Sequence, residues 1–358
     1  MERLGIVGLP NAGKSALFNA LTGGSALVAP HPFSTTETNV GMARVHDPRL
    51  LALSEMSESK KTVPATVEFV DIAGLVAGAS TGEGLGNRFL AGVREADALT
   101  LVLRAFVDEN VVGGHDPVDD LAVLELELVL ADAATVESQI NKRRKAARAD
   151  KSLASEVVAL EAAEAVLQAG TPIYRSNLDA DQRNLLKPFF LLTNKPVLAV
   201  VNLGEDQVAE ADAIVKAVAD EVAGAAEVLG VSVQLEAEAA QLSDEERTEL
   251  LEGLGLGEGA LPRVVRAAYH LLGLRTFLTT GDKESRAWTL RAGAKAPECA
   301  GVIHSDLQRG FIRAEVIHWD ELLDLGSWNK AKEVGRLRVE GKDYEVVDGD
   351  VLEIRFNV

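Results

Sequence analysis

The chain has 358 residues, of which 47% are hydrophobic and 25% charged, a composition typical of a soluble globular protein with two or three domains. Its single cysteine, Cys299, excludes an intramolecular disulfide and a cysteine-based metal cluster. The net charge of −19 argues against non-specific binding to nucleic acid, although residues 276–358, with 12 Lys/Arg and 15 Asp/Glu, are nearly balanced. No apolar run reaches the roughly 18 residues of a membrane span and no targeting segment is visible, so we expect a cytoplasmic protein without membrane contact.

The first part of the chain alternates short apolar runs with helix-like segments. Strand patterns occur in "RLGIVGL" (3–9), "TVEFVDIAG" (66–74), "ADALTLVLRAF" (96–106) and "KPVLAVVN" (195–202), and we expect a further strand within "VSVQLEAE" (231–238). Strands separated by helices predict an α/β domain with a mostly parallel sheet.

Two later regions have a different texture. Residues 121–150 and 151–170 are rich in Ala, Leu and Glu and contain no proline, which predicts two long helices joined near Asp150 as an antiparallel hairpin. After about residue 275, short strands and glycine turns with one or two helices predict an α+β module.

The segment "GLPNAGKS" (8–15) follows a predicted strand and opens a predicted helix, as the phosphate-loop pattern G-x-x-x-x-G-K-S requires. Backbone N–H groups of such a loop and of the helix N-terminus hold phosphate oxygens. Lys14 would reach the outer phosphates as a catalytic residue, and the Ser15 hydroxyl would bind Mg²⁺. The nucleotide-binding residues predicted here are Asn11, Ala12, Gly13, Lys14, Ser15 and Ala16.

A D-x-x-G motif closes the strand pattern at residues 66–74. Asp71 would hold the magnesium shell and Gly74 would let the backbone approach the γ-phosphate. The D-x-x-G motif alone is common, and the alternative is an Asp that only caps a turn. The distance of this motif after a phosphate loop favours a nucleotide site. In the intervening segment "PHPFSTTETNVG" (30–41), Thr35 or Thr36 can reach Mg²⁺ when a γ-phosphate is bound, but a plain surface loop fits equally well.

The motifs "GLPNAGKS", "PFSTTETNVG" and "DIAGLVAGASTGEGLGNRFL" resemble those of the Obg-related branch of P-loop GTPases. "NLGE" (202–205), the helical insert and the endings "RAWTLRAGAKAPECAGVIHSDLQRGFIRAEVI" (286–317) and "VEGKDYEVVDGDVLEIRFNV" (339–358) are similar to those of its YchF-type subfamily. The resemblance runs essentially from end to end. It implies a P-loop G domain at residues 1–122 and 193–275, an inserted helical hairpin at 123–192 and a C-terminal α+β TGS-like domain at 276–358.

The same resemblance implies a function and refines the metal site. Members of this subfamily hydrolyse ATP, often with GTP as a weaker ligand, and associate with ribosomes. The family pattern P-F-x-T assigns the switch threonine to Thr35, so the expected Mg²⁺ ligands are Ser15, Thr35 and Asp71. This chain has Thr36 and Thr38 where the family commonly has an aliphatic residue and proline, which keeps Thr36 as the alternative.

Hydrolysis is expected to be slow. The position after D-x-x-G, where Ras-like enzymes place a water-orienting glutamine, holds Leu75, which has no polar atom. The water must then be positioned by another side chain, by backbone, by a cation or by a partner. Among side chains, His115 in the loop "NVVGGHDPVDD" (110–120) is the candidate of most interest, because histidine titrates near neutral pH. The alternative is an exposed loop histidine that caps the next helix together with Asp116.

The base-reading motif departs from the Asn-Lys-x-Asp of GTPases. Leu203 replaces the lysine that packs along the base, and Glu205 is one methylene longer than the aspartate that accepts two guanine donors. These two changes damage guanine selectivity. Adenine presents a donor beside an acceptor, so a carboxylate cannot accept two hydrogen bonds from it. A preference for adenine is implied only by the resemblance. Asn202 either reads the base edge or ties loops together. The residues predicted around the base are Asn202, Leu203, Glu205, Ser232, Val233 and Gln234.

A cluster of cations occurs near the predicted hairpin tip: Lys142, Arg143, Arg144, Lys145 and Arg148. It can contact ribosomal RNA, or it is a solvated helix end favoured by the helix dipole. The TGS-like domain is an interaction module in the family. Three functions therefore compete: an Mg²⁺-dependent ATPase that acts as a nucleotide-dependent switch on the large subunit or 70S ribosome in translation or stress regulation, a GTP-specific GTPase, and a nucleotide-sensing ribosome- or RNA-binding module with incidental hydrolysis.

Overall fold

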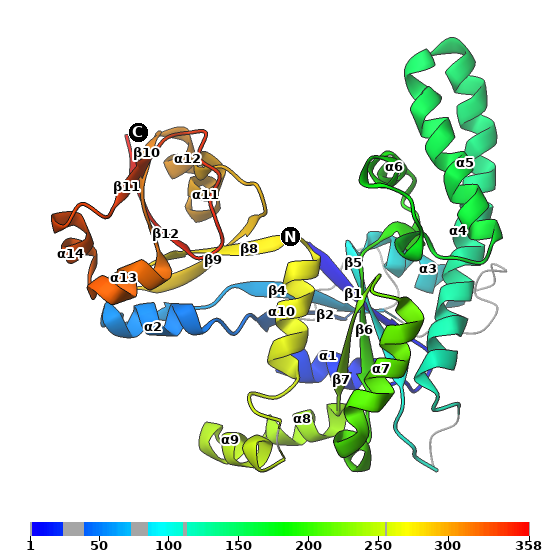
Figure 1. Ribbon diagram of the computed structural model, residues 1–358, viewed down its shortest axis with the longest axis horizontal. Coiled ribbons are helices and arrows are strands. Elements are labelled where there is room, and N and C mark those ends of the chain that lie inside the picture. Colours follow the sequence, from blue (N-terminus) through cyan, green and yellow to red (C-terminus); the bar gives the residue numbers. More distant parts are fainter. Residues whose placement is uncertain (1, 24–38, 73–84, 110–112, 255, 358) are drawn as a thin grey trace. The chain divides into compact units, whose positions relative to one another are not determined.

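The computed structural model describes residues 2–23, 39–72, 85–109, 113–254 and 256–357. The chain forms two compact units, the first made of Met1–Ala43 and Glu68–Ala268, the second of Arg44–Val67 and Tyr269–Val358 (Figure 1). The boundaries expected from sequence place residues 44–67 in the G domain, whereas in the structure this segment packs with the C-terminal unit. The rest of the predicted division stays a prediction.

The described strands of the first unit form one sheet. In spatial order they are β2 (Asn39–Arg44), β4 (Thr66–Asp71), β1 (Arg3–Gly8), β5 (Ala98–Arg104), β6 (Val197–Asn202) and β7 (Glu227–Val231). Neighbours from β4 to β7 run parallel, with Gly5 opposite Val70 on one side and Leu99 on the other. This confirms the predicted parallel sheet and brings the loops after these strands to one edge.

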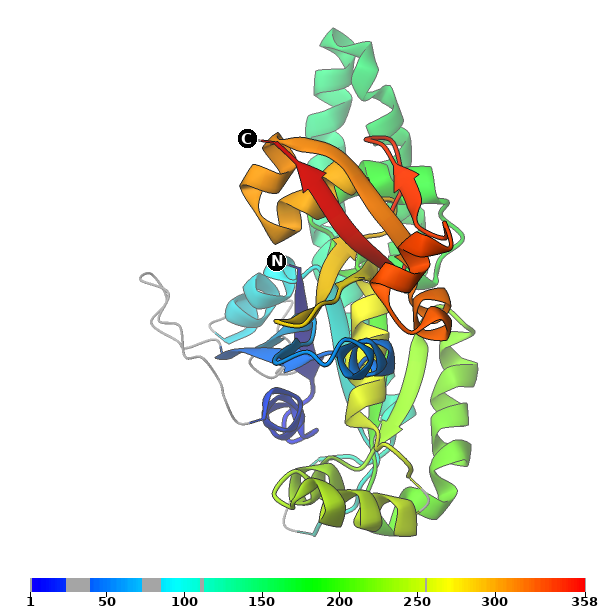
Figure 2. The same cartoon turned by 90° about the vertical axis from the view of Figure 1, so that its left-hand side faces the viewer.

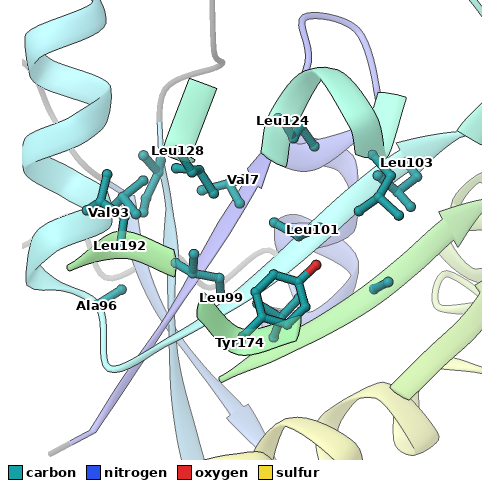
Figure 3. Packing of buried hydrophobic residues seen from close by; sticks show 14 of the residues in the cluster. Val7, Val93, Ala96, Leu99, Leu101, Leu103, Leu124, Leu128, Tyr174 and Leu192 are labelled. Atoms are coloured by element: carbon teal, nitrogen blue, oxygen red, sulfur yellow. The ribbon is translucent and has the colours of Figure 1, made fainter. Parts of the chain in front are cut away.

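Helices cover the sheet because their apolar faces match its apolar strands. The described helices of this unit are α1 (Lys14–Thr22), α3 (Leu85–Glu95), α4 (Pro117–Ala149), α5 (Ala154–Gln168), α6 (Ala180–Leu186), α7 (Ala211–Val222), α8 (Val233–Ala239), α9 (Asp244–Gly253) and most of α10 (Leu261–Leu271), whose residues from Tyr269 on are counted with the second unit. Figure 3 shows Val93 of α3 and Leu124 and Leu128 of α4 packed against Leu99 and Leu101 of β5. The start of the long helix α4 is thereby fixed on the sheet, next to the edge where the loops meet.

The prediction for "VSVQLEAE" is largely wrong. The strand lies earlier, at Glu227–Val231, and residues 233–239 form α8. The alternation at the start of this segment suggests a strand, but Val233 and Ala239 are buried on one side of a helix, and the buried Glu236 accepts a hydrogen bond from Ala260 N ahead of α10.

The predicted helical hairpin is confirmed, with α4 and α5 joined by a short 3₁₀ turn at Lys151–Leu153 (Figures 1 and 2). Its core includes Val136, Ile140, Leu160 and Phe189. Buried Asp132 of α4 accepts hydrogen bonds from Leu192 N (2.8 Å), Thr193 N (2.7 Å) and Thr193 Oγ1 (2.7 Å), which fastens the returning chain to the helix. No described helix combines the length and the apolar character needed to cross a bilayer.

The second unit is a mixed sheet with helices. In spatial order its described strands are β11 (Arg338–Glu340), β10 (Phe311–His318), β12 (Asp350–Phe356), β8 (Leu274–Thr279), β9 (Ser285–Arg291) and β3 (Thr62–Val63). Its described helices are α2 (Pro48–Met56), α11 (Ala296–Ile303), α12 (Ser305–Arg309), α13 (Trp319–Leu325) and α14 (Trp328–Glu333). The α+β class is confirmed, but four described helices follow residue 275, where the sequence predicts one or two. The segment 44–67 joins this unit because β3 pairs with β9 and Arg49 Nη1 lies 2.6 Å from Asp348 Oδ2.

Candidate nucleotide-binding site

The phosphate loop connects β1 to α1 at the carboxyl edge of the first sheet. Asn11 (φ 64°) and Gly13 (φ 96°) adopt the left-handed conformation, which glycine and asparagine tolerate best. A Cβ on Gly13 would lie 2.2 Å from Asn202 Nδ2, and a Cβ on Gly8 would lie 2.6 Å from the Val102 carbonyl oxygen. Both glycines of the motif are therefore required by close approach of neighbouring groups.

Lys14 begins α1 and is only 9% exposed. Its Nζ donates a hydrogen bond to the Leu9 carbonyl at 2.8 Å, which holds the ammonium inside the curve of the loop. Burial lowers the pKa of Lys14, and the nearby carboxylates of Asp71 and Asp120 act in the opposite direction. A partly desolvated cation at this position interacts strongly with an anionic ligand.

Ser15 and Asp71 come together although they are 56 positions apart. Ser15 Oγ donates to Asp71 Oδ2 at 2.7 Å, across the space between the start of α1 and the end of β4. A hydroxyl and a carboxylate oxygen are the hard ligands that Mg²⁺ prefers. In phosphate-loop proteins the remaining coordination positions of Mg²⁺ are filled by phosphate and water, not by further protein groups. The predictions for Gly74, Thr35, Thr36 and Leu75 lie outside the described residues.

Asn202 ends β6 and is 5% exposed. Its Nδ2 donates to the Ala12 carbonyl of the phosphate loop at 3.0 Å, and its Oδ1 accepts from Val233 N at 3.3 Å. Both ends of the amide thus bond to backbone, so in this structure Asn202 ties the loops together, one of the two roles expected of it.

Leu203 and Glu205 differ in their surroundings. The Leu203 side chain is 4% exposed and packs in the core, where it lines a cavity of about 360 Å³ together with Val215, Gly230 and Ser232. Glu205 is exposed at the start of a short 3₁₀ helix, Glu205–Glu210. The position of the base-packing lysine is therefore occupied by a side chain that serves the core.

The loop after β7 holds the remaining residues predicted around the base. Ser232 is buried and precedes α8, and its Oγ has no hydrogen-bond partner within the described part of the chain. Val233 supplies its backbone N–H to Asn202, while Gln234 is exposed and donates to Glu238 Oε1 at 3.3 Å. Backbone from this loop thus reaches the site, and the Gln234 side chain follows its own helix.

Two charged residues that the sequence analysis missed belong to this edge. Arg104 ends β5, is buried, and places its guanidinium 4.5 Å from the centre of the Phe106 ring. Asp120 in the first turn of α4 accepts from Arg104 N at 2.9 Å; burial raises its pKa although that hydrogen bond and the Arg104 charge lower it. Phe106 N and Ala105 N both donate to the Asn202 carbonyl. The signal available was an arginine at the end of an otherwise apolar strand, beside an acidic helix start.

Comparison with known proteins identifies the family. The chain is 47% identical to the "Ribosome-binding ATPase YchF" of Bacillus subtilis (strain 168) and 44% identical to that of Escherichia coli O157:H7, with 99% of each chain covered. The chain belongs to the YchF family. A solved relative, the YchF GTPase of Schizosaccharomyces pombe, superposes with a TM-score of 0.87 at 33% identity, covering 99% of this chain and 97% of that one.

Two family models match this YchF protein in the expected order. One described as "50S ribosome-binding GTPase" matches residues 3–129, and YchF-GTPase_C, described as a "Protein of unknown function", matches residues 274–357. The phosphate-loop site and the family together make the chain a P-loop nucleotide hydrolase. They also confirm the predicted fold class, a P-loop α/β domain with a C-terminal α+β domain.

His115 is exposed in the segment just before α4. Its neighbour Asp116 caps that helix, with Oδ1 accepting from Val118 N at 2.8 Å. The capping part of the alternative interpretation therefore belongs to Asp116, and a role of His115 in this YchF site stays a prediction.

Proposed function

We propose that this chain is an Mg²⁺-dependent ATP hydrolase, with GTP as a weaker ligand, that binds the ribosome and changes this contact with its nucleotide state. The observation that carries the proposal is the base-reading loop. Both polar atoms of the Asn202 side-chain amide are hydrogen-bonded to backbone groups. Leu203 is buried at the position where a GTPase packs a lysine along the base. The names of the Bacillus subtilis and Escherichia coli relatives support both the ATPase and the ribosome assignment.

The damaged guanine site favours relaxed or inverted base selectivity. Guanine is held in GTPases by a carboxylate that accepts two donors, and Glu205 carries its carboxylate one methylene further out from an exposed position. Removal of one such paired hydrogen bond, which leaves its partner unsatisfied, costs about 1–3 kcal/mol, or roughly fivefold to 150-fold in affinity. That is enough for ATP to bind more tightly than GTP.

The residues that would hold the nucleotide phosphates follow the usual phosphate-loop pattern. Loop N–H groups and the start of α1 would hold phosphate oxygens, Lys14 would pair with the outer phosphates, and Ser15 and Asp71 would hold Mg²⁺. Bound Mg²⁺ would neutralise charge that develops on the phosphoryl oxygens. Thr35, with Thr36 as the alternative, is proposed as the switch threonine that senses the γ-phosphate.

Positioning of the attacking water is assigned to His115. The His115→Ala variant should lower kcat by about tenfold to a thousandfold and change nucleotide affinity by no more than about twofold. A loss of about a hundredfold or more would match the usual contribution of a general base. His46→Ala, which removes another exposed histidine, is the matched control. Unchanged turnover in His115→Ala would remove this residue from the mechanism.

The hairpin tip and the TGS-like domain are proposed as the surfaces that contact the ribosome. Arg143 and Arg144 lie 3.3 Å from Glu156 and 2.7 Å from Glu161, so part of their charge is neutralised within the hairpin. Lys142, Lys145 and Arg148 are exposed and available to ribosomal RNA. Because ribosomes are cytoplasmic, the proposal places the protein in the cytoplasm.

Release of phosphate from ATP and GTP, with Mg²⁺ or EDTA, tests the proposal together with co-sedimentation on 70S ribosomes. We expect Mg²⁺-dependent turnover that is faster with ATP, nucleotide-dependent pelleting, and at least a hundredfold loss of turnover in Lys14→Ala but not in the surface control Lys216→Ala. If Lys14→Ala pellets and acts in cells like the wild type, the protein is a binding module with incidental hydrolysis. A tenfold preference for GTP would make it a GTPase.

A further inference from the structure

Phe190 occupies a backbone conformation that does not suit its side chain. It follows the short 3₁₀ helix Lys187–Phe189, its N–H donates to the Lys187 carbonyl at 3.1 Å, and its φ and ψ are 51° and 41°. Left-handed positions at helix ends favour glycine or asparagine, because a Cβ crowds the backbone there. Among the described residues, the other non-glycine residues with positive φ are Asn11, Glu58 and Ala223, none of them aromatic.

The ring of Phe190 is also exposed. Phe189 and Leu191 on either side are buried in the hairpin core, but 65% of Phe190 is accessible to solvent. The residue therefore combines an unfavourable backbone conformation with an aromatic side chain in water. A strained residue that the surrounding structure holds in place is a reason to look for a function.

Cations lie close to this segment in the fold, although one of them, Arg143, is also paired with Glu156 at 3.3 Å. Arg143 of α4 places its guanidinium 5.2 Å from the centre of the Phe189 ring, and Lys187 is exposed one turn before Phe190. Residues 141–152, which include the hairpin tip, hold six Lys/Arg and one Asp in a chain whose net charge is −19. An exposed aromatic ring beside cations is the combination that binds unpaired nucleotides, with the base stacked on the ring and the phosphates near the cations.

We propose that Phe190 stacks on an unpaired base of a structured RNA, while Lys187 and the hairpin-tip cations contact the flanking phosphates. This inference rests on the proposed ribosome contact and names the chemistry of that contact. A protein partner that buried Phe190 would also have to desolvate the neighbouring cations, whereas RNA neutralises them. RNA is therefore the partner that fits both features of the surface.

Phe190→Asn separates a binding role from a structural one, because asparagine suits the left-handed position. The probe is a fluorescent RNA stem closed by a six-nucleotide unpaired loop, compared with the same stem as a blunt duplex. We expect the full-length variant to unfold at the same or a higher temperature than the wild type and to bind the looped RNA about fivefold to a hundredfold more weakly, with duplex binding unchanged. Val158→Ala, which removes another exposed apolar side chain from the hairpin, is the matched control and should change neither value.

The dependence of affinity on salt tells stacking from charge. Lys142→Gln combined with Lys145→Gln should weaken binding of both RNAs and lower the slope of log affinity against log salt by up to about two, one for each phosphate that the protein no longer neutralises. Phe190→Asn should leave the slope unchanged, because it removes no charge. A changed slope in Phe190→Asn would contradict stacking.

Co-sedimentation of wild type and variant with 70S ribosomes distinguishes failure of this inference from failure of the proposed function. If the wild type does not pellet, the ribosome assignment fails, while the looped RNA still decides the inference. If the variant binds looped RNA like the wild type, the inference is overturned, and a loss confined to the ribosome would assign Phe190 to a ribosomal protein instead. A lower unfolding temperature in both Phe190→Asn and Phe190→Gly would show a structural role and also overturn it.

Discussion

Asn202 is the residue that connects the phosphate loop to the base-reading loops. Its amide bonds to the Ala12 carbonyl and to Val233 N, and its own carbonyl accepts from Ala105 N and Phe106 N. Three loops that follow different strands thus meet on one side chain and its backbone. We therefore expect Asn202 to support nucleotide binding by holding the loops in place, whichever base is bound.

Replacement of Asn202 by alanine should therefore weaken the binding of ATP and of GTP equally. At a net value of about 0.5–1.5 kcal/mol for each hydrogen bond, loss of the two costs about 1–3 kcal/mol, so we expect both dissociation constants to rise roughly fivefold to 150-fold while their ratio stays within about threefold. Fluorescence titration with labelled nucleotides measures both, with Asn184→Ala, an exposed asparagine of α6, as the control. A loss confined to one nucleotide would show that Asn202 reads the base.

Cys299 should be inert in the folded protein. It is buried in α11, and burial, with the nearby charges of Glu298 and Asp350, raises the pKa of its thiol to about 12. Since the thiolate is the reactive form, iodoacetamide should modify the native protein at least about a hundredfold more slowly than the protein in urea at pH 8. Rapid modification of the native protein would contradict the burial of this helix.

At the scale of elements, the segment 44–67 shows how a contact between distant residues assigns a segment to a unit. Arg49 of α2 bonds to Asp47 and to Asp348, which is 299 positions away. Burial raises the pKa of Asp348, but hydrogen bonds from Arg49 Nη1 and Thr276 N outweigh this and hold its pKa below the usual value of 3.8. The ionised carboxylate therefore stabilises the second unit.

Asp348→Asn should destabilise the second unit by about 1–2 kcal/mol at pH 7. Because the folded-state pKa is depressed, the stabilisation is complete well above the unfolded value of 3.8 and is lost as the pH falls through the folded value below it. The difference between wild type and variant should thus narrow below about pH 4. Urea unfolding followed by tryptophan fluorescence reports this unit, since Trp288, Trp319 and Trp328 all lie in it.

The control for this measurement is Asp343→Asn, which removes a carboxylate that is 98% exposed and lies 3.2 Å from Lys295. Such a surface pair contributes little, so this variant should match the wild type. Equal stability of Asp348→Asn and wild type at pH 7 would contradict the proposed role of the Arg49–Asp348 pair.

The elements also show which features the sequence reveals. The phosphate loop, Asp71 and Asn202 were predictable because each belongs to a local motif at the end of an apolar strand. Arg104 and Asp120 were missed because their roles depend on how the end of β5 meets the first turn of α4, which no local pattern describes. The apolar start of "VSVQLEAE" predicts a strand, whereas the strand ends at Val231 and α8 begins at Val233, whose N–H donates to Asn202 Oδ1.

At the scale of the whole molecule, the chain combines a nucleotide site on a parallel sheet with two candidate surfaces for a large partner. The site lies at the carboxyl edge of the first sheet, and α4 begins there, with Asp120 bonded to Arg104, before it continues into the hairpin. The basic tip belongs to that hairpin, and Phe190 lies in the chain that returns from it, directly after the 3₁₀ helix Lys187–Phe189. Both occur in a chain whose net charge is −19. Attraction to RNA is therefore expected to be local to the hairpin and not a property of the chain as a whole.

The central claim is that the phosphate loop is intact while guanine selectivity is damaged. Equilibrium titration of the purified full-length protein with ATP and with GTP, each with Mg²⁺, tests it most directly. The account predicts that ATP binds more tightly than GTP and that Lys14→Ala weakens the binding of both nucleotides. Binding of GTP tenfold or more tighter than ATP would show that Glu205 still reads guanine and would contradict the account.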